Sequence, residues 1–498
     1  MWLELAVFFT ALAVLAYLDV RKPSNYPPGP PRWPLLGNLV QVARLVKRTG
    51  FHHLAWARLA ERYGAVVALR MGRSQTVVLV AGRRAVTQVL ASEHFDGRPD
   101  GYLFRLRTMG RRHGVIFTDG DLWRTQRRFS LKQLRELGFG RRSMEAMIAS
   151  EALAAARRLR EEGAERGEAG VPMKHAFVVP VLNSLWAITA GTTYSEKDPR
   201  LQRFISMSNE IFRNSDSSGG ALNYLPFLRF LAPTLSGYKQ FFTNQYNLWC
   251  FFTDIVRDHV ATLSKDYNRD LIDVFLQEMD KQKDTKETTF TEAQIVAVCK
   301  DLFTAGSETT SNTLSFAIMF AVLHPEAQGR VHSELDEVVG RDRPPSLQDK
   351  SKLTYVSAFL METQRLSNVA PMTLPHRALV DAEIDGYFVP KDSTVIMSLW
   401  SCHMDPDHWE DPENFRPERF IDSQGRLISD PWLMPFGYGR RRCLGETLAK
   451  NSLFLFFAVL LQSLSFRLPE GAERPSYSGQ NGLTLSTQPF SAVVTQRP

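Results

Sequence analysis

The chain alternates between helical and strand-like hydrophobic patterns, and the helical pattern predominates. Near the N-terminus, residues 52–64 (HHLAWARLAERYG) have helical periodicity, whereas residues 65–72 (AVVALRMG) and 75–82 (QTVVLVAG) are short runs rich in β-branched residues. From residue 121 to about residue 324 the apolar spacing is again mostly helical. The pattern therefore predicts a mainly α fold with a minor β region.

Further strand-like runs lie in the C-terminal quarter of the chain. Residues 378–399 contain several short β-like pieces, and the last strands are expected within 464–469 (LSFRLP) and 483–496 (LTLSTQPFSAVVTQ). After residue 35 the sequence has no repeat and no long linker rich in Ser, Gly or Pro. Residues 36–498 are therefore expected to form one large globular unit.

The first 20 residues differ in character from the rest. Residues 5–18 are apolar and are followed by Arg21 and Lys22, which favours a membrane anchor with the bulk of the protein in the cytoplasm. A cleaved signal peptide is the alternative, because the apolar run is short for a membrane span. Glu4 argues against cleavage, since it stands where a signal peptide carries positive charge. We expect an anchor at 1–20 and a basic, proline-rich linker at 21–35.

Composition narrows the classes of ligand and partner. The formal charge of +7 is modest for 498 residues, and the basic residues are dispersed without a recognition motif, so nucleic-acid binding is not expected. The 32 phenylalanines can build a deep core and a lipophilic cavity within it. The four cysteines include no CxxC pair, so we expect neither a disulfide framework nor a structural zinc site.

One cysteine lies in an unusual context. Cys443 follows a glycine-rich, basic loop, PFGYGRRRCLG, and precedes an apolar helical stretch. Glycine lets the backbone approach a flat ligand closely, and a thiolate at a helix start is stabilised by the helix dipole. These features suit a cysteine ligand to haem iron. For any cysteine taken alone, a buried inert thiol is the simpler interpretation.

The pattern F-x-x-G-x-R-x-C-x-G, formed by Phe436, Gly439, Arg441, Cys443 and Gly445, resembles the haem-binding signature of the cytochrome P-450 family. The resemblance implies the cytochrome P-450 fold, haem b as the cofactor, and Cys443 as the axial ligand to iron. It covers nearly the whole chain, because four other stretches match the family in order.

Residues 299–320 (CKDLFTAGSETTSNTLSFAIMF) form the second matching stretch. In the family this helix crosses above the haem. By resemblance, Ala305 leaves room for the cofactor, Thr309 holds a hydrogen bond to dioxygen and Glu308 assists proton delivery. The simpler alternative is that the Thr309 hydroxyl only makes a hydrogen bond within its own helix and has no catalytic role.

The remaining matches concern charged residues. Glu362 and Arg365 in ETQR, with Arg419 in FRPERF, resemble the structural Glu-Arg-Arg network of the family. Within residues 121–136, Trp123 and Arg127 lie on one face of the predicted helix, and a stripe of basic residues lies on another face. By resemblance, the haem propionates are bound by Trp123, Arg127, His376, Arg441 and Arg98. The basic stripe, Arg124, Arg128, Lys132 and Arg135, is either a reductase-docking surface or an ordinary solvated face.

The resemblance implies monooxygenation of a lipophilic small molecule at the endoplasmic reticulum membrane. Electrons come from NADPH through NADPH-cytochrome P-450 reductase, with cytochrome b5 as a further candidate partner. The candidate pocket residues are Val115, Ile116, Phe117, Ala305, Val369, Ala370, Leu374, Leu483 and Thr484.

Within the microsomal class the chain is similar to insect epoxidases that convert methyl farnesoate in juvenile hormone biosynthesis. The alternatives are steroid or ecdysteroid hydroxylation and broad xenobiotic oxidation. A thiolate-haem isomerase or dehydratase, or a non-catalytic haem binder or sensor, are the alternatives from other classes, and none of these consumes NADPH.

Overall fold

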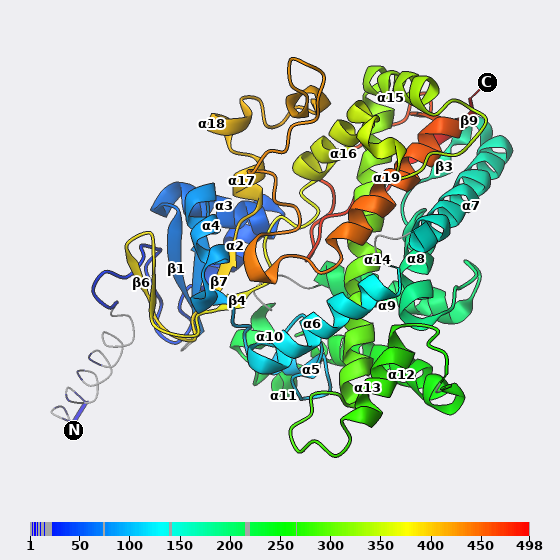
Figure 1. The fold of residues 1–498 in the computed structure, drawn as a ribbon. Helices are drawn as coiled ribbons and strands as arrows, with labels where there is room; N and C mark the ends of the chain where they lie inside the picture. Colours follow the sequence, from blue (N-terminus) through cyan, green and yellow to red (C-terminus); the bar gives the residue numbers. More distant parts are fainter. Residues whose placement is uncertain are drawn as a thin grey trace.

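A computed structural model describes residues 22–497 except 73–74, 139–141, 215–219 and 265, together with isolated positions before residue 22. Helices occupy most of it (Figure 1). Their bounds are α2 Leu39–Thr49, α3 His52–Tyr63, α4 Arg83–Ala91, α5 Tyr102–Leu106, α6 Gly120–Glu136, α7 Arg142–Arg166, α8 Val178–Ala190, α9 Pro199–Asn214, α10 Gly220–Tyr224, α11 Leu228–Leu231, α12 Tyr238–Thr262, α13 Leu271–Lys281, α14 Glu292–Leu323, α15 Pro325–Val338, α16 Thr354–Ser367, α17 Trp400–His403, α18 Pro406–Trp409 and α19 Glu446–Ser463.

In the described part of the chain the strands are short and form three small sheets. Their bounds are β1 Val66–Met71, β2 Gln75–Val80, β3 Val171–Pro172, β4 His376–Arg377, β5 Ala382–Ile384, β6 Tyr387–Val389, β7 Thr394–Met397, β8 Leu464–Arg467 and β9 Ser491–Gln496. The strand orders are β1-β2-β7-β4, β3-β9-β8 and β5-β6. The predicted mainly α fold with a minor β region is confirmed. The expected strand at 483–496 is shorter, because only its last six residues join the sheet.

The long helix α14 runs through the middle of the fold (Figure 1). It has 32 residues and so extends about 48 Å. Its residues are buried on nearly every side, because α8, α12, α16 and α19 all pack against it. Around Phe303 the aromatic rings interlock edge to face, with ring centroids 4.2 Å from Phe204 and 4.5 Å from Trp186. This packing holds α14 as a rigid wall.

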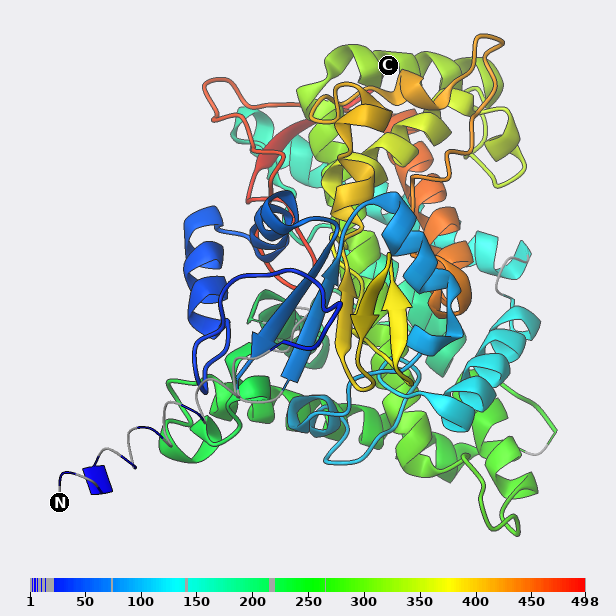
Figure 2. The ribbon, with the colours of Figure 1, turned by 90° about the vertical axis from the view of Figure 1, so that its left-hand side faces the viewer.

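The four-stranded sheet joins residues 66–80 to residues 376–397. β2 pairs in parallel with β7, with Val77 opposite Thr394, and the yellow strand lies beside the blue ones in Figure 2. β4 pairs with the other edge of β7, and Arg377 bridges Gly97. Arg98 follows Gly97 and His376 precedes Arg377, so this antiparallel bridge brings the two residues side by side although they are distant in sequence.

No helix among the described residues is both long and apolar enough to cross a membrane. The expected anchor at residues 1–20 lies largely outside the described residues, so it stays a prediction.

Candidate active site

The segment before α19 presents Cys443 at the end of a tightly bound loop. The backbone N–H of Cys443 donates to the carbonyl of Phe436 at 2.9 Å. Gly439 has a φ of +69°, and a Cβ at this position would lie 2.0 Å from the carbonyl oxygen of Leu90. Glycine is therefore required where this loop crosses the end of α4.

His403 fixes the start of the same loop. It is fully enclosed and donates from Nδ1 to the side-chain oxygen of Asn368 at 2.7 Å. Its Nε2 accepts the backbone N–H of Met434 at 2.9 Å. Burial and, next, the charge of Arg365 lower the pKa of His403 to about 3, so the imidazole is neutral and keeps both hydrogen bonds.

The Cys443 thiol opens onto a cavity of about 640 Å³. Of the four cysteines, all of which lie in the described part of the chain, Cys443 alone lines this cavity. Burial raises the pKa of its thiol, while the backbone N–H of Gly445 and the cations of Arg127 and Arg442 act in the opposite direction. Phe436 and Gly445 also line the cavity, whereas Gly439 does not.

A cation cluster lines the same cavity: it comprises Arg98, Arg127 and Arg441, with Trp123 and the imidazole of His376 beside them. Burial lowers the pKa of His376 well below its ordinary value, so this imidazole is neutral. The guanidinium of Arg441 lies 3.7 Å from the centroid of the Trp123 ring. Burial and then the charge of Arg98 lower the pKa of Arg441 to about 8. Burial also lowers the pKa of Arg98 to about 10. Because burial disfavours the charged forms of these arginines, an anion placed among them would stabilise those charged forms.

Hydrogen bonds orient this cluster but leave part of it without a partner. Arg98 donates to the carbonyl oxygens of Ile116 and Pro375, at 3.0 and 2.9 Å. His376 Nδ1 donates to the carbonyl of Phe95 at 2.7 Å. Arg441 donates through Nε and Nη2 to the Asp96 carbonyl, but its buried Nη1 finds no acceptor among the described residues.

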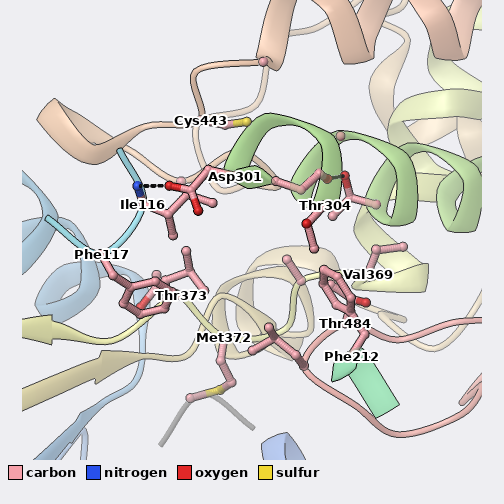
Figure 3. Close-up of a pocket in the computed structure, with 18 of the residues that line it drawn as sticks. Ile116, Phe117, Phe212, Asp301, Thr304, Val369, Met372, Thr373, Cys443 and Thr484 are labelled. Atoms are coloured by element: carbon pink, nitrogen blue, oxygen red, sulfur yellow. Dashed lines mark hydrogen bonds between the residues drawn. The ribbon is translucent and has the colours of Figure 1, made fainter. Parts of the chain in front are cut away.

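The cavity walls come from segments that are far apart in the sequence (Figure 3). All the expected pocket residues line it: Val115, Ile116, Phe117, Ala305, Val369, Ala370, Leu374, Leu483 and Thr484. Asp301 on α14 holds one wall in place, because its Oδ2 accepts the backbone N–H groups of Val115 and Ile116 at 2.8 and 3.0 Å. A Cβ on Gly114 would lie 2.3 Å from that oxygen, so the contact requires glycine there.

Thr309 and Glu308 point in different directions. Thr309 lines the main cavity, and its hydroxyl donates to the Ala305 carbonyl at 2.8 Å. Glu308 instead lines a separate small polar cavity of about 80 Å³. Its carboxylate accepts from Arg213 at 3.2 Å and from Asn312 at 3.0 Å. A role for Glu308 in proton delivery therefore requires release from Arg213 and stays a prediction.

The structure brings Glu362, Arg365 and Arg419 into one buried network. Arg365 donates to both carboxylate oxygens of Glu362, at 2.7 and 2.8 Å, and Arg419 Nε donates to the same group at 3.1 Å. Arg365 also donates to the His403 carbonyl at 2.8 Å. The network thus supports the helix turn that positions the cysteine loop.

Comparison with known proteins identifies the family. The family model "Cytochrome P450" matches residues 27–494. The chain belongs to the cytochrome P450 family. It is therefore a monooxygenase, and its family implies haem held through a cysteine thiolate.

The relatives include insect and vertebrate cytochromes P450. The chain is 38% identical to "Farnesoate epoxidase" of Bombyx mori, over 95% of this chain and 94% of that protein. It is 39% identical to "Probable cytochrome P450 305a1" of Drosophila melanogaster, over 96% of each chain. It is 33% identical to "Cytochrome P450 2U1" of Homo sapiens, over 98% of this chain and 92% of that one.

The residues of this cytochrome P450 fit haem. The cavity offers one accessible thiol as a metal ligand, and its cation cluster with the unpartnered Nη1 of Arg441 suits the carboxylates of that cofactor. The small residues Ala305 and Gly306 on α14 also line the cavity and leave room for a flat group.

Several residues that shape the site were not identified from the sequence: Arg213, Gln245, Lys300, Asp301 and His403. For Lys300 and Asp301 a signal existed, because adjacent charges interrupt an otherwise apolar helix. Arg213 and His403 carry no local signal, since their partners are distant in sequence.

Proposed function

We propose that this cytochrome P450 inserts one atom of dioxygen into a lipophilic small molecule, with Cys443 as the thiolate ligand. The observation that carries the proposal is the shared cavity of the Cys443 thiol, the cation cluster and apolar walls. Haem bound there supplies the dioxygen-activating chemistry. Arg98, Trp123, Arg127, His376 and Arg441 would hold its propionates, with Phe436, Gly445 and Ala305 against its faces.

The protein's own contribution is positioning, proton supply and exclusion of water. Thr309 places a hydroxyl at the cavity surface beside Ala305, where it can hold or pass a proton. Glu308 is the acid next to it, and its exchange between Arg213 and the cavity side would renew that proton. The apolar walls at 115–117 and 369–374 orient the substrate and exclude bulk water.

We further propose NADPH as the electron source, through NADPH-cytochrome P450 reductase, with cytochrome b5 as a second partner. The basic stripe on α6 supports a docking surface, because Arg124, Arg128, Lys132 and Arg135 are all exposed. α6 also carries Trp123 and Arg127 into the cavity, so a partner bound to its outer face would lie close to the cofactor.

The proposed location is the cytoplasmic face of the endoplasmic reticulum membrane. Residues 1–20 would form the anchor, 21–35 the linker and 36–498 the catalytic unit. Large apolar side chains near α11 support membrane contact, because Phe230, Leu231 and Leu235 are 73%, 76% and 94% exposed.

We propose epoxidation of methyl farnesoate as the reaction, which the similarity to the farnesoate epoxidase of Bombyx mori supports. The apolar walls accept such a chain. Steroid or ecdysteroid hydroxylation is the alternative, and parallel incubation of both substrates with NADPH and reductase distinguishes them. Turnover of a steroid without turnover of methyl farnesoate would overturn this substrate.

The first test concerns the thiolate itself. The carbon-monoxide difference spectrum of the reduced, haem-loaded protein is compared with that of Cys443→Ser, and Cys402→Ser serves as the matched control. We expect a strongly red-shifted Soret band that is lost in Cys443→Ser and kept in Cys402→Ser, because Cys402 is buried away from the cavity. A folded, haem-loaded native protein without this band refutes the proposal.

A further inference from the structure

A band of polar side chains lines one part of the otherwise apolar cavity. Its members, drawn from α12, α14 and the segment after α5, are Gln240, Asn244, Gln245, Lys300, Asp301 and Arg107. Lys300 lies nine residues before Thr309 on α14, which places their backbones about 14 Å apart along the helix. The band is thus well separated from the reactive region.

Lys300 is the least expected member. Its side chain belongs to a residue that is only 2% exposed, and its ammonium donates to the side-chain oxygen of Gln245 and to the carbonyl of Arg107. In its protonated form Lys300 carries three N–H groups, one more than these two acceptors among the described residues satisfy. Burial lowers the pKa of Lys300 well below its ordinary value, which means that an added acceptor would stabilise the charged form.

Gln245 adds a second open donor. Its residue is 1% exposed, its side-chain oxygen accepts from Lys300, and its Nε2 makes no hydrogen bond within the described part of the chain. Both residues line the cavity. A ligand oxygen in the cavity could therefore accept from both side chains.

The other members of the band are already partnered. Asp301 accepts from Arg107 at 3.2 Å and from two backbone N–H groups. Asn244 and Gln240 donate to Glu210, at 2.9 and 3.0 Å. Asn244 and Arg107 keep further N–H groups beside them, but Lys300 and Gln245 are the most deeply buried donors of the band.

We propose that Lys300 and Gln245 bind a carboxylate or ester oxygen at one end of an elongated apolar substrate, whose far end is oxidised near Thr309. The two backbone positions lie about 14 Å apart along α14, so a ligand that reaches both must be elongated. The inference rests on the proposed monooxygenase function and deepens it by naming the substrate class. Lys300 then determines both affinity and the position of oxidation.

A purely structural role for Lys300 makes a different prediction. If Lys300 only ties α12 to the segment at Arg107, its loss weakens all ligands alike. If it binds the acceptor oxygen, its loss weakens only ligands that carry one. The ratio of two affinities therefore separates the two roles.

The experiment titrates the haem-loaded protein with methyl dodecanoate, dodecanoate and tetradecane, and follows the Soret band. In the native protein we expect the better of the two oxygen-bearing ligands to bind at least about tenfold more tightly than the hydrocarbon, and their order tells ester from carboxylate. In Lys300→Met we expect that preference to fall at least about tenfold, with hydrocarbon binding unchanged or tighter. Gln245→Met should reduce it in the same direction, which keeps the test valid if Lys300→Met does not fold.

Lys281→Met is the matched control, because Lys281 has a 71% exposed side chain on α13 and should leave the ratio unchanged. Each variant must first show the red-shifted carbon-monoxide band. Its absence from the native protein refutes the proposed function. An intact band with the same ratio in native, Lys300→Met and Gln245→Met proteins refutes this inference alone.

Discussion

Replacing Arg365 by Met should be among the most damaging single changes outside the cavity. Arg365 and Glu362 have side chains that are 0% exposed. The substitution removes two hydrogen bonds to Glu362, at 2.7 and 2.8 Å, and two to the carbonyls of His403 and Asn414, at 2.8 and 3.2 Å. Among the described residues, Glu362 would then keep as partners Arg419 and the backbone N–H of Arg416.

The magnitude follows from this burial. Loss of one partner from a buried ion pair costs about 3–5 kcal/mol, because the remaining charge stays desolvated. Replacing Glu362 and Arg365 together by Met removes that stranded charge, so the double variant should be no less stable than Arg365→Met. Arg419 would still pair with Asp411, which lies 3.1 Å away.

Urea unfolding, followed by tryptophan fluorescence, measures the loss in the free energy of unfolding. The control is Arg58→Met, since Arg58 and Glu61 also lie three residues apart on a helix but are 66% and 58% exposed. It should cost less than about 1 kcal/mol. A loss below about 1.5 kcal/mol for Arg365→Met, or a double variant clearly less stable than the single one, would refute the reasoning.

The remaining predictions concern the cysteine loop. The folded pKa of His403 is lowered to about 3 by burial and then by Arg365, so below pH 6.5 the unfolded chain binds a proton that the folded chain does not. The free energy of unfolding should therefore fall with decreasing pH by up to about 1.4 kcal/mol per unit more in the native protein than in His403→Gln; equal slopes between pH 7.5 and 5.5 would contradict this. Gly439→Ala should destabilise by several kcal/mol, because its Cβ would meet the Leu90 carbonyl at 2.0 Å. Gly437→Ala has a similar φ of +71° but open space, so about 1–2 kcal/mol is expected, and equal losses in urea unfolding would refute the steric argument.

Local patterns predicted the elements better than their arrangement. The strands at 66–71 and 75–80 and the helix at 52–63 follow directly from hydrophobic periodicity. The parallel pairing of β2 with β7 does not, because nothing local in either strand specifies a partner more than 300 residues away. Helix α2 went unpredicted, since it adjoins the proline-rich segment and buries only Val42.

The candidate site shows the same division. Cys443, Trp123 and Arg441 could be assigned because each belongs to a specific motif, and the structure brings all three to one cavity. The direction of the Glu308 carboxylate could not, because it depends on Arg213 from a helix 95 residues earlier. The open donors of Lys300 and Gln245 likewise exist only once α12 and α14 have packed together.

The pairing of segments near the N-terminus with segments of the C-terminal quarter has a consequence for the order of events during synthesis. The Asp96 carbonyl and its partner Arg441 are 345 residues apart, which is about 17–70 s of translation at 5–20 residues per second. For most of that interval β2 lacks its partner β7, and for all of it the cation cluster lacks the segment that carries the thiol. The cofactor can therefore be captured only after almost the whole chain has been made, and until β7 has been made the edge of β2 is open to wrong pairing.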